Sequence, residues 1–112
     1  MAPRKTFEHL EYSLADALNI VGEWWTPLIV WSIAGGSHRF DDIQASLEIA
    51  RNILADRLQT LVTHGVVERR QYSDRPARFE YHLTERGEEL IPVLMQLEAW
   101  GAKWAMPVER ED

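Results

Sequence analysis

Hydrophobic residues in the middle of the chain follow a helical period on both sides of a short break. Phe40, Ile43 and Leu47 recur at i, i+3 and i+7, which places them on one face of a helix. A second helical face follows, with Leu54, Leu58, Leu61 and Val62. The intervening Glu48–Ala50 is long enough only for a turn. Residues 38–64 therefore predict a helix-turn-helix, a motif whose second helix can lie in the major groove of DNA.

The second helix exposes a polar face if its leucines point inward. That face carries Arg51, Asn52, Ala55, Asp56 and Gln59. Arg and Asn at the start of such a helix can form paired hydrogen bonds with guanine and adenine. The same pattern also fits an ordinary corner between two helices with a solvated face, so the helix pair alone leaves both interpretations open.

The hydrophobic period changes from helical to alternating after Gly65, which is placed to end the helix in a left-handed conformation. Strands are expected at Val66–Tyr72 and Arg78–Leu83, joined by a turn at residues 73–77. A hairpin in this place is a wing, and Arg75 and Arg78 near its tip can contact phosphates or enter a minor groove. The combination favours DNA binding over a hairpin that is merely soluble.

Apolar helices are expected on both sides of this unit. Residues 7–21 predict one helix, with a possible later start and cap at Ser13. Residues 24–34 predict another, started by Thr26-Pro27 and ended by two glycines, and buried almost all round. The residues expected inside it are Leu28, Ile29, Ile33 and one or more tryptophans.

The last helix, about residues 85–105, carries two apolar faces. Thr84 is expected to cap it and Pro92 to kink it or to separate a short first turn. One face is a heptad-like stripe of Leu90, Leu94, Leu97, Gly101 and Trp104, and the other holds Val93, Met95 and Trp100. We expect a second copy of the chain to cover one face, with helix 7–21 contributing; the alternative is that both faces pack on helix 24–34.

The fold expected from these elements is one domain, residues 1–112, mainly α with a small β-hairpin. It is a winged helix-turn-helix with the motif at about 40–64, the wing at about 66–83, and N- and C-terminal dimerisation helices. The chain contains no cysteine, which removes disulfides, thiolate zinc sites and thiol redox sensing. No apolar run approaches the ~20 residues that span a bilayer, and a cytoplasmic protein is expected.

The net charge of −6 weakens the case for DNA binding, but the acidic excess lies outside the central unit. Residues 37–87 hold eight arginines against eight acidic residues, and the flanks hold the other four basic and ten acidic residues. Phosphate binding needs a locally basic surface rather than a basic whole. The total charge predicts poor non-specific affinity at physiological salt.

Sites of other kinds find little support in the sequence. His9, His38, His64 and His82 lack metal-ligand spacing, no phosphate-binding loop is present, and no serine has the context of a nucleophile. No catalytic residue, metal site or cofactor is therefore expected. Trp24, Trp31 and Trp100 are candidates for an aromatic ligand pocket, although tryptophans of this kind more often belong to a core or a dimer interface.

Residues 12–104 resemble the HxlR-type winged helix-turn-helix transcriptional regulators, relatives of the MarR group. The resemblance is carried by W-T-x-L-I, R-F-D-D, D-R-L-x-x-L-V-x-x-G and E-Y-x-L-T-x-x-G in this order. It implies a bacterial homodimer that binds a near-palindromic operator in double-stranded DNA. Arg51 and Asn52, with Gln59 nearby, would read bases, whereas Arg39, Arg75 and Arg78 would contact the backbone or a minor groove. Arg57 is instead a candidate for an internal pair with an acid.

Two departures from the family pattern matter. Many members carry a cysteine just before the first helix, and here that region has none, which excludes thiol sensing for this chain. Ala50 stands where many relatives have a serine that could cap the recognition helix. The resulting hypothesis is a transcriptional regulator, more plausibly a repressor, with an unidentified small-molecule effector acting through the interface helices. The alternative is a winged-helix module that binds proteins rather than an operator.

Overall fold

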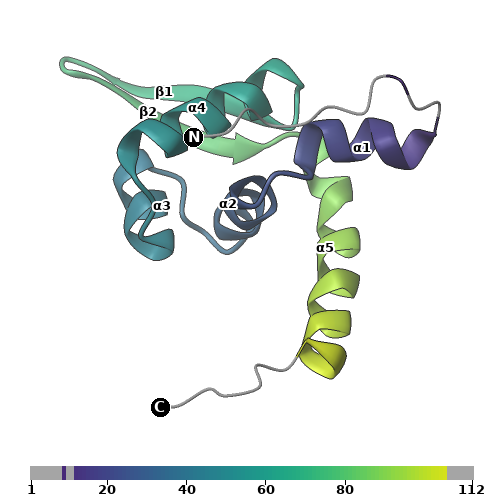
Figure 1. Cartoon of the computed structure of the whole chain (residues 1–112). Coiled ribbons are helices and arrows are strands. Elements are labelled where there is room, and N and C mark those ends of the chain that lie inside the picture. Colours follow the sequence, from purple (N-terminus) through teal and green to yellow (C-terminus); the bar gives the residue numbers. More distant parts are fainter. Residues whose placement is uncertain (1–8, 10–11, 106–112) are drawn as a thin grey trace, which may run out of the picture.

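The computed structural model of the chain describes residue 9 and residues 12–105. In this part the elements are α1 (Ser13–Val21), α2 (Trp25–Ala34), α3 (Phe40–Leu47), α4 (Arg51–Thr63), β1 (Val67–Asp74), β2 (Ala77–Leu83) and α5 (Glu85–Trp104). The expected class is confirmed: the fold is mainly helical, with one antiparallel hairpin and the topology of a winged helix-turn-helix (Figure 1). None of the described helices is both long and apolar enough to cross a membrane.

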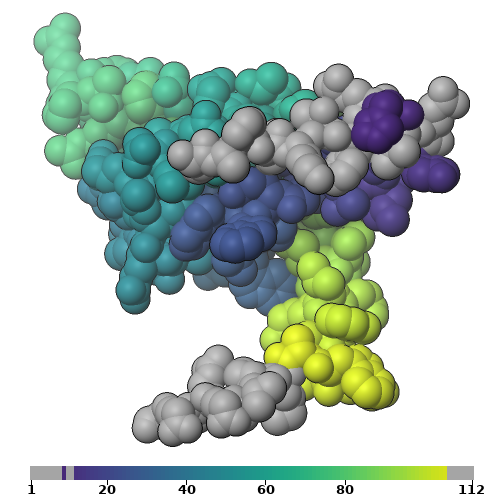
Figure 2. Space-filling view, viewed as in Figure 1, coloured from purple at the N-terminus to yellow at the C-terminus, as the bar shows by residue number. Residues whose placement is uncertain are grey.

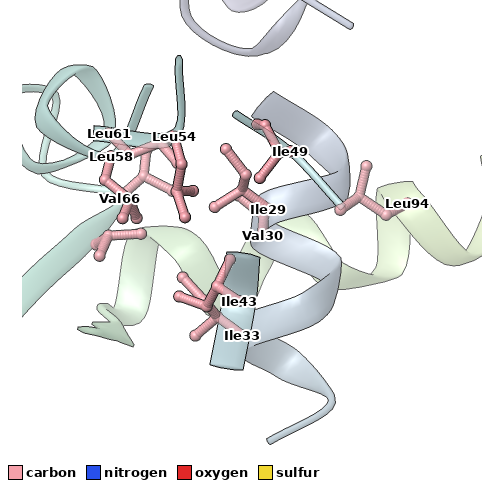
Figure 3. Close-up of a cluster of buried hydrophobic side chains, with 11 residues drawn as sticks. Ile29, Val30, Ile33, Ile43, Ile49, Leu54, Leu58, Leu61, Val66 and Leu94 are labelled. Atoms are coloured by element: carbon pink, nitrogen blue, oxygen red, sulfur yellow. The ribbon is translucent and has the colours of Figure 1, made fainter. Parts of the chain in front are cut away.

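The core lies where α2, α3 and α4 meet. Ile29 and Ile33 of α2 are buried against Ile43 of α3, while Leu54 and Leu58 of α4 close the other side (Figure 3). Ile49, in the turn between α3 and α4, is 3% exposed and belongs to the same core cluster. Complete burial of a Leu or Ile side chain contributes about 1.5–3 kcal/mol, so this cluster fixes the angle between α3 and α4.

The turn between α3 and α4 depends on a left-handed backbone conformation at Glu48, which residues other than glycine rarely adopt. Glu48 has φ 54° and ψ 44°, in the left-handed region, and its N–H donates to the carbonyl of Gln44 at 2.7 Å. The side chain of Gln44 donates to the carbonyl of Ile49 at 3.2 Å. These two bonds hold the turn, although a non-glycine residue there costs about 1 kcal/mol.

The far end of α4 closes with the pair of bonds typical of a left-handed cap. Gly65 has φ 75°, its N–H donates to the carbonyl of Val62 at 3.0 Å, and the N–H of Val66 donates to the carbonyl of Leu61 at 2.9 Å. This is a Schellman motif, and it confirms the expected role of Gly65. It turns the chain directly into β1.

The wing is longer than the sequence predicts, because β1 continues to Asp74 and β2 begins at Ala77. The strands pair from Val67 with Leu83 to Asp74 with Ala77, and the register shifts between Gln71 and Ser73. Tyr72 therefore lies in a β-bulge, which commonly re-aims a side chain. Only Arg75 and Pro76 remain at the tip.

Helix α5 begins against the base of the wing. The Thr84 side chain accepts a hydrogen bond from the N–H of Gly87 at 3.2 Å, which confirms the expected cap. A Cβ at Gly87 would collide with the carbonyl oxygen of Val66, so only glycine allows this approach. The helix then runs unbroken through Pro92 and away from the other elements, so that most of its second half is open (Figures 1 and 2).

The flanking helices follow some of the expectations and contradict others. Helix α1 begins at Ser13, which is the later start that the sequence offers, but the expected cap at Ser13 is wrong, because Tyr12 is the N-cap and makes no side-chain hydrogen bond; residues 7, 8, 10 and 11 of the longer predicted helix lie outside the described part. Helix α2 begins at Trp25 rather than Trp24 and is not buried all round, because Leu28 is 48% exposed. Pro92 lies inside one continuous α5, so of the two expected effects the separation of a short first turn is wrong. Pattern alone does not show which side of an apolar helix has a neighbour.

Candidate nucleic-acid interface

The polar face of α4 points away from the core. Arg51, Asn52, Ala55, Asp56 and Gln59 are all exposed, as the sequence predicts, while the leucines of the same helix are buried. Asn52 makes no polar contact that would occupy its amide within the described residues. The Gln59 amide donates to the Thr63 hydroxyl at 3.3 Å, which leaves its carbonyl oxygen outward. This face can present both donors and acceptors to base edges.

Arg51, in contrast to Asn52, is held by α3. Its Nη1 lies 3.2 Å from Oδ1 of Asp41 and donates to Oε1 of Gln44 at 3.3 Å. The guanidinium also lies over the Phe40 ring, 4.6 Å from its centroid. The Arg51 side chain is nevertheless 67% exposed. Two helices thus fix the start of the recognition face, although the sequence shows no helical spacing that would pair these residues.

The N-terminus of α4 carries no side-chain cap. Ala50 is extended, with φ −64° and ψ 142°, and no side chain accepts a hydrogen bond from the first turn. The free N–H groups of a first turn, together with the helix dipole, favour an anion in front of them. The cap that Ala50 cannot provide is therefore not supplied by another described side chain.

Two arginines of the wing have partners within the hairpin, and two others do not. Arg69 lies over the Phe79 ring at 4.2 Å, and Arg70 is paired with Glu68, so both have partners within the hairpin. Arg75 and Arg78 are exposed and form no ion pair with any described residue. The two arginines assigned to DNA from the sequence are thus the ones that the wing leaves available.

A groove separates the wing from the start of α3. Arg39 lines this groove, with its guanidinium carbon 4.6 Å from the centroid of the Tyr72 ring and its Nε 3.7 Å from Oε2 of Glu80. The groove is lined by Arg39, Phe40, Asp41, Asp42, Tyr72, Arg78 and Phe79. The structure therefore brings Arg39 and Arg78 to one surface. Tyr72 joins them through the bulge, which the alternating pattern of the sequence does not reveal.

Arg57, although on the same helix as Arg51, points inward. Its Nε lies 3.0 Å from Oε1 of Glu23, and the two side chains are 11% and 13% exposed. The Nε–H is not directed at an acceptor, so this contact is an ion pair without hydrogen-bond geometry. The same Oε1 accepts from the N–H groups of Trp25 and Thr26 at 2.8 and 3.1 Å. The internal pair expected for Arg57 is present, and it ties α4 to the start of α2.

The environment of Glu23 keeps its carboxylate charged. Burial by itself raises the pKa of Glu23, but the Arg57 guanidinium and the donors of Trp25 and Thr26 outweigh burial and hold the pKa below that of an ordinary glutamate. The Glu23 carboxylate in turn raises the pKa of Arg57. Both residues are thus ionised at neutral pH, and neither is available to DNA.

Two histidines lie behind the groove, between the α2–α3 loop and the wing. The rings of His38 and His82 are stacked with centroids 4.2 Å apart. His38 Nδ1 is 2.9 Å from the carbonyl oxygen of Tyr81, and His82 Nε2 is 2.9 Å from Oε1 of Glu80. The bond with His82 is the main cause that lowers the pKa of Glu80. No group of three or more potential metal ligands forms among the described residues.

The large apolar side chains that remain exposed lie almost entirely away from this face. Twelve of the described ones are exposed, and apart from Tyr72 of the wing they belong to α1, α2, α5 or the residues next to them. Trp24, Trp31 and Trp100, the candidate ligand residues, are 86%, 40% and 59% exposed. Trp100 lines a groove on α5 with Val93, Gln96, Leu97, Ala99, Lys103 and Trp104. Neither Trp24 nor Trp31 belongs to that groove.

The relation of this arrangement to known proteins follows from comparison of the whole chain. Residues 20–109 match the family described as HxlR-like helix-turn-helix. The chain belongs to the HxlR-like helix-turn-helix family. Its relatives carry the names of transcriptional regulators rather than of enzymes, and it is a DNA-binding regulator of this type.

Three similar proteins place this HxlR-like chain among the regulators. It is 37% identical over 92 residues to YvaP of Bacillus subtilis, an uncharacterized HTH-type transcriptional regulator, covering 81% of this chain and 85% of YvaP. It is 40% identical over 92 residues to an uncharacterized regulator of Mycobacterium tuberculosis, covering 82% of this chain but 58% of that longer protein. The crystal structure of PA1607, a candidate transcription factor, matches with a TM-score of 0.82 and 33% identity over 94% of this chain and 73% of PA1607.

Proposed function

We propose that this HxlR-like protein is a cytoplasmic repressor that binds a near-palindromic operator as a homodimer. The observation that carries this proposal is the division of its surface. One face holds Arg51, Asn52, Arg75 and Arg78, exposed and directed outward, whereas the exposed large apolar side chains gather on α1, α2 and α5. A polar, partly cationic face suits a polyanion, and an open apolar face suits another apolar surface.

The second copy is expected to cover the open face of α5. Val93, Leu97, Trp100 and Trp104 are between 57% and 65% exposed and share one groove. Exposed apolar surface of this extent is uncommon on a monomer and typical of an interface. A symmetric dimer buries the same groove twice, and the exposed Leu14 and Leu18 of α1 would add apolar surface to the interface. Trp24, Trp31 and Trp100 become part of, or border, this interface, where an aromatic effector would have access to them.

DNA recognition is expected to use the first turn of α4 and the wing together. The free N–H groups behind Ala50 lie at a phosphate, Arg51 and Asn52 enter the major groove, and Arg75 and Arg78 follow the backbone to the neighbouring minor groove. Two such units related by a twofold axis require half-sites about 34–36 Å apart or a multiple of that distance. Occupation of a promoter by such a dimer blocks its use by the polymerase.

Selection of duplexes from a randomised DNA library tests the proposal without knowledge of the operator. The wild-type protein is expected to enrich an inverted repeat, and fluorescence anisotropy with that duplex should show binding at least 1,000-fold tighter than to random DNA, by the order of magnitude usual for specific regulators. Affinity should fall steeply with salt, because bound phosphates release counterions.

Two variants of one residue separate base reading from charge. Arg51→Ala is expected to lose about 1–3 kcal/mol of discrimination at one base pair of each half-site. Arg51→Lys keeps the charge but not the planar fork, so it should restore affinity for random DNA without restoring discrimination. If no duplex is enriched at low salt, the alternative of a winged-helix module for protein partners replaces operator binding. An asymmetric enriched site would instead contradict the twofold dimer.

A further inference from the structure

The contacts of Arg51 with α3 occupy one nitrogen of its guanidinium and leave the other two without a partner among the described residues. Both contacts with Asp41 and Gln44 use Nη1, at 3.2 and 3.3 Å. No described residue accepts a hydrogen bond from Nε or Nη2. An arginine has five N–H donors, so the three on Nε and Nη2 stay available, and two of these, Nε–H and one Nη2–H, lie on the Nε–Nη2 edge. Two donors on one edge are what bidentate binding to guanine O6 and N7 requires.

The plane of the guanidinium is fixed as well as its edge. Phe40 lies beneath it with the guanidinium carbon 4.6 Å from the ring centroid, and Phe40 is half-buried and packs against the core. The ring face attracts the cation and restricts its rotation. A side chain ordered before binding loses less conformational entropy when it meets a base. All three partners come from α3, and the core fixes that helix against α4.

We propose that Asp41 is a positioning residue for base recognition, which holds Arg51 so that its Nε–Nη2 edge faces a guanine in the major groove. This inference rests on the proposed operator binding and names the residue of that surface that sets its specificity. Asp41 is 84% exposed, so the core does not require a carboxylate there. A carboxylate beside a DNA-binding surface weakens binding to every sequence through repulsion of phosphates. The Asp41 carboxylate therefore increases selectivity between base pairs while it lowers affinity for DNA of every sequence.

Asp42 provides a matched control for this role. It follows Asp41 in the first turn of the same helix, it is also exposed, and it makes no contact with Arg51. Asp41→Asn and Asp42→Asn each remove one negative charge near the groove and the same favourable charge from the N-terminus of α3. A purely electrostatic effect on DNA must therefore appear in both variants, whereas positioning of Arg51 is weakened only in the first, because Asn keeps the Oδ1 acceptor but not the charge that strengthens the hydrogen bond.

The experiment measures discrimination on the duplex that the wild-type protein selects from a randomised library. All single base-pair variants of one half-site are titrated with wild type and with Arg51→Ala, and the guanine whose replacement no longer matters to Arg51→Ala is the one that Arg51 reads. At that position Asp41→Asn should reduce the discrimination ratio by about three- to tenfold, a fraction of what a bidentate pair provides. Asp42→Asn should leave the ratio within about twofold of wild type. Equal ratios for the two variants would overturn the proposal.

A measurement without DNA keeps this test separate from the proposed function. In the free protein, ¹⁵N relaxation of the Arg51 Nε–H should report an ordered side chain in wild type and in Asp42→Asn, and a more mobile one in Asp41→Asn. Unchanged order in Asp41→Asn would contradict the positioning role even if an operator is found. If no duplex is selected but the order falls as expected, operator binding fails while the contact itself is established, and Asp41 then has no role in base reading.

Discussion

The central unit and the flanking helices use their apolar residues in opposite ways. In residues 38–83 nearly every large apolar side chain is buried or half-buried, and Tyr72 is the only exposed one among these residues. In α1 and α5 the order is reversed: Leu14 is 70% exposed and Trp104 is 65% exposed. The helix-turn-helix and wing are thus complete within one chain, whereas the flanks have apolar faces that this chain does not cover.

This difference separates two tasks that one small domain has to combine. A surface that meets DNA must present hydrogen-bonding and cationic groups with fixed geometry, so its scaffold needs a finished core behind it. A surface that meets a second copy gains from the apolar area that it leaves exposed. The acidic excess of the chain also lies in the flanking sequence, outside residues 37–87.

The largest effect is expected from a charge placed in the apolar groove of α5. Trp100→Glu removes a large apolar contact and places a carboxylate where the partner would bury it, and each change costs about 2 kcal/mol or more. The dissociation constant of the dimer should rise about 1,000-fold, as measured by analytical ultracentrifugation. Operator affinity should fall with it, because each monomer then binds one half-site.

Ala102→Glu is the control for this variant. It adds the same carboxylate to the same helix at an exposed position that does not line the groove. The dimer should persist. If both variants remain dimeric at micromolar concentration, the groove is not the interface. The exposed apolar face of α5 would then not be explained by a second copy of the chain.

The next effect concerns the ion pair that joins α4 to the start of α2. Glu23→Gln keeps an acceptor for the Trp25 and Thr26 N–H groups but removes the buried counter-ion of Arg57, which keeps only the exposed carboxylate of Asp56, 2.7 Å from its Nη1. Removal of one partner of a buried pair costs about 3–5 kcal/mol, so the free energy of unfolding at pH 7 should fall by about 3 kcal/mol in urea titrations. Glu68→Gln, which breaks the exposed pair with Arg70, should change it by less than about 1 kcal/mol.

The same pair predicts a pH dependence with a definite sign. Folding lowers the pKa of Glu23, so the unfolded chain binds its proton more tightly than the folded one. The stabilisation is therefore present in full above the pKa of an unfolded glutamate, about 4.3, and is lost as pH falls through the lower pKa of the folded state. The difference in unfolding free energy between wild type and Glu23→Gln should shrink below about pH 4. A difference that grows with acid would contradict the lowered pKa.

A smaller effect is expected from the arginines of the wing. Arg75→Ala removes one unpaired cation at the tip of each wing, so affinity should fall by a similar factor for operator and random DNA. The slope of log affinity against log salt should flatten by about 1.8 per dimer, from about 0.9 per lost phosphate contact. Arg70→Ala is the control, because Glu68 already neutralises that guanidinium. Equal slopes for wild type and Arg75→Ala would place the tip away from DNA.

The smallest effect concerns the turn of the helix-turn-helix itself. Glu48→Gly should raise the free energy of unfolding by about 0.5–1 kcal/mol, because glycine adopts the left-handed conformation without the steric cost of a Cβ. Glu48→Ala keeps the Cβ and should give no such gain. Thermal or urea unfolding of the three proteins measures both changes, and a destabilised glycine variant would show that the Glu48 side chain has a role beyond the turn.

Prediction from sequence succeeded where local chemistry decides the structure. The inward leucines of α4, the cap at Thr84, the left-handed Gly65 and the internal pair of Arg57 all follow from residue type and spacing. The wing was placed correctly but two residues too short at the end of β1 and one at the start of β2, because turn residues can also pair as strand.

The remaining features depend on contacts between distant residues. The contact of Arg51 with Asp41 needs the angle between two helices, and the contact of Tyr72 with Arg39 needs a bulge that the strand pattern does not show. The exposure of Leu28 and Trp31 was missed for a related reason, since a strongly apolar helix such as α2 has little contrast between its faces. The base-reading roles assigned from sequence stay predictions.

The junction between α4 and α5 converts a small rotation of α5 into a larger displacement at its far end. Arg86 Nη1 donates to the carbonyl of His64 at 2.8 Å, and the Thr84 hydroxyl donates to the carbonyl of Gly65 at 2.5 Å, so the end of one helix is fastened to the start of the other. Twenty residues of α5 make an arm of about 30 Å. A rotation of α5 by about 5° at this junction displaces the far end of the helix by about 2.6 Å. In a dimer joined through its two α5 helices, the spacing between the two α4 helices would therefore depend on this same small angle.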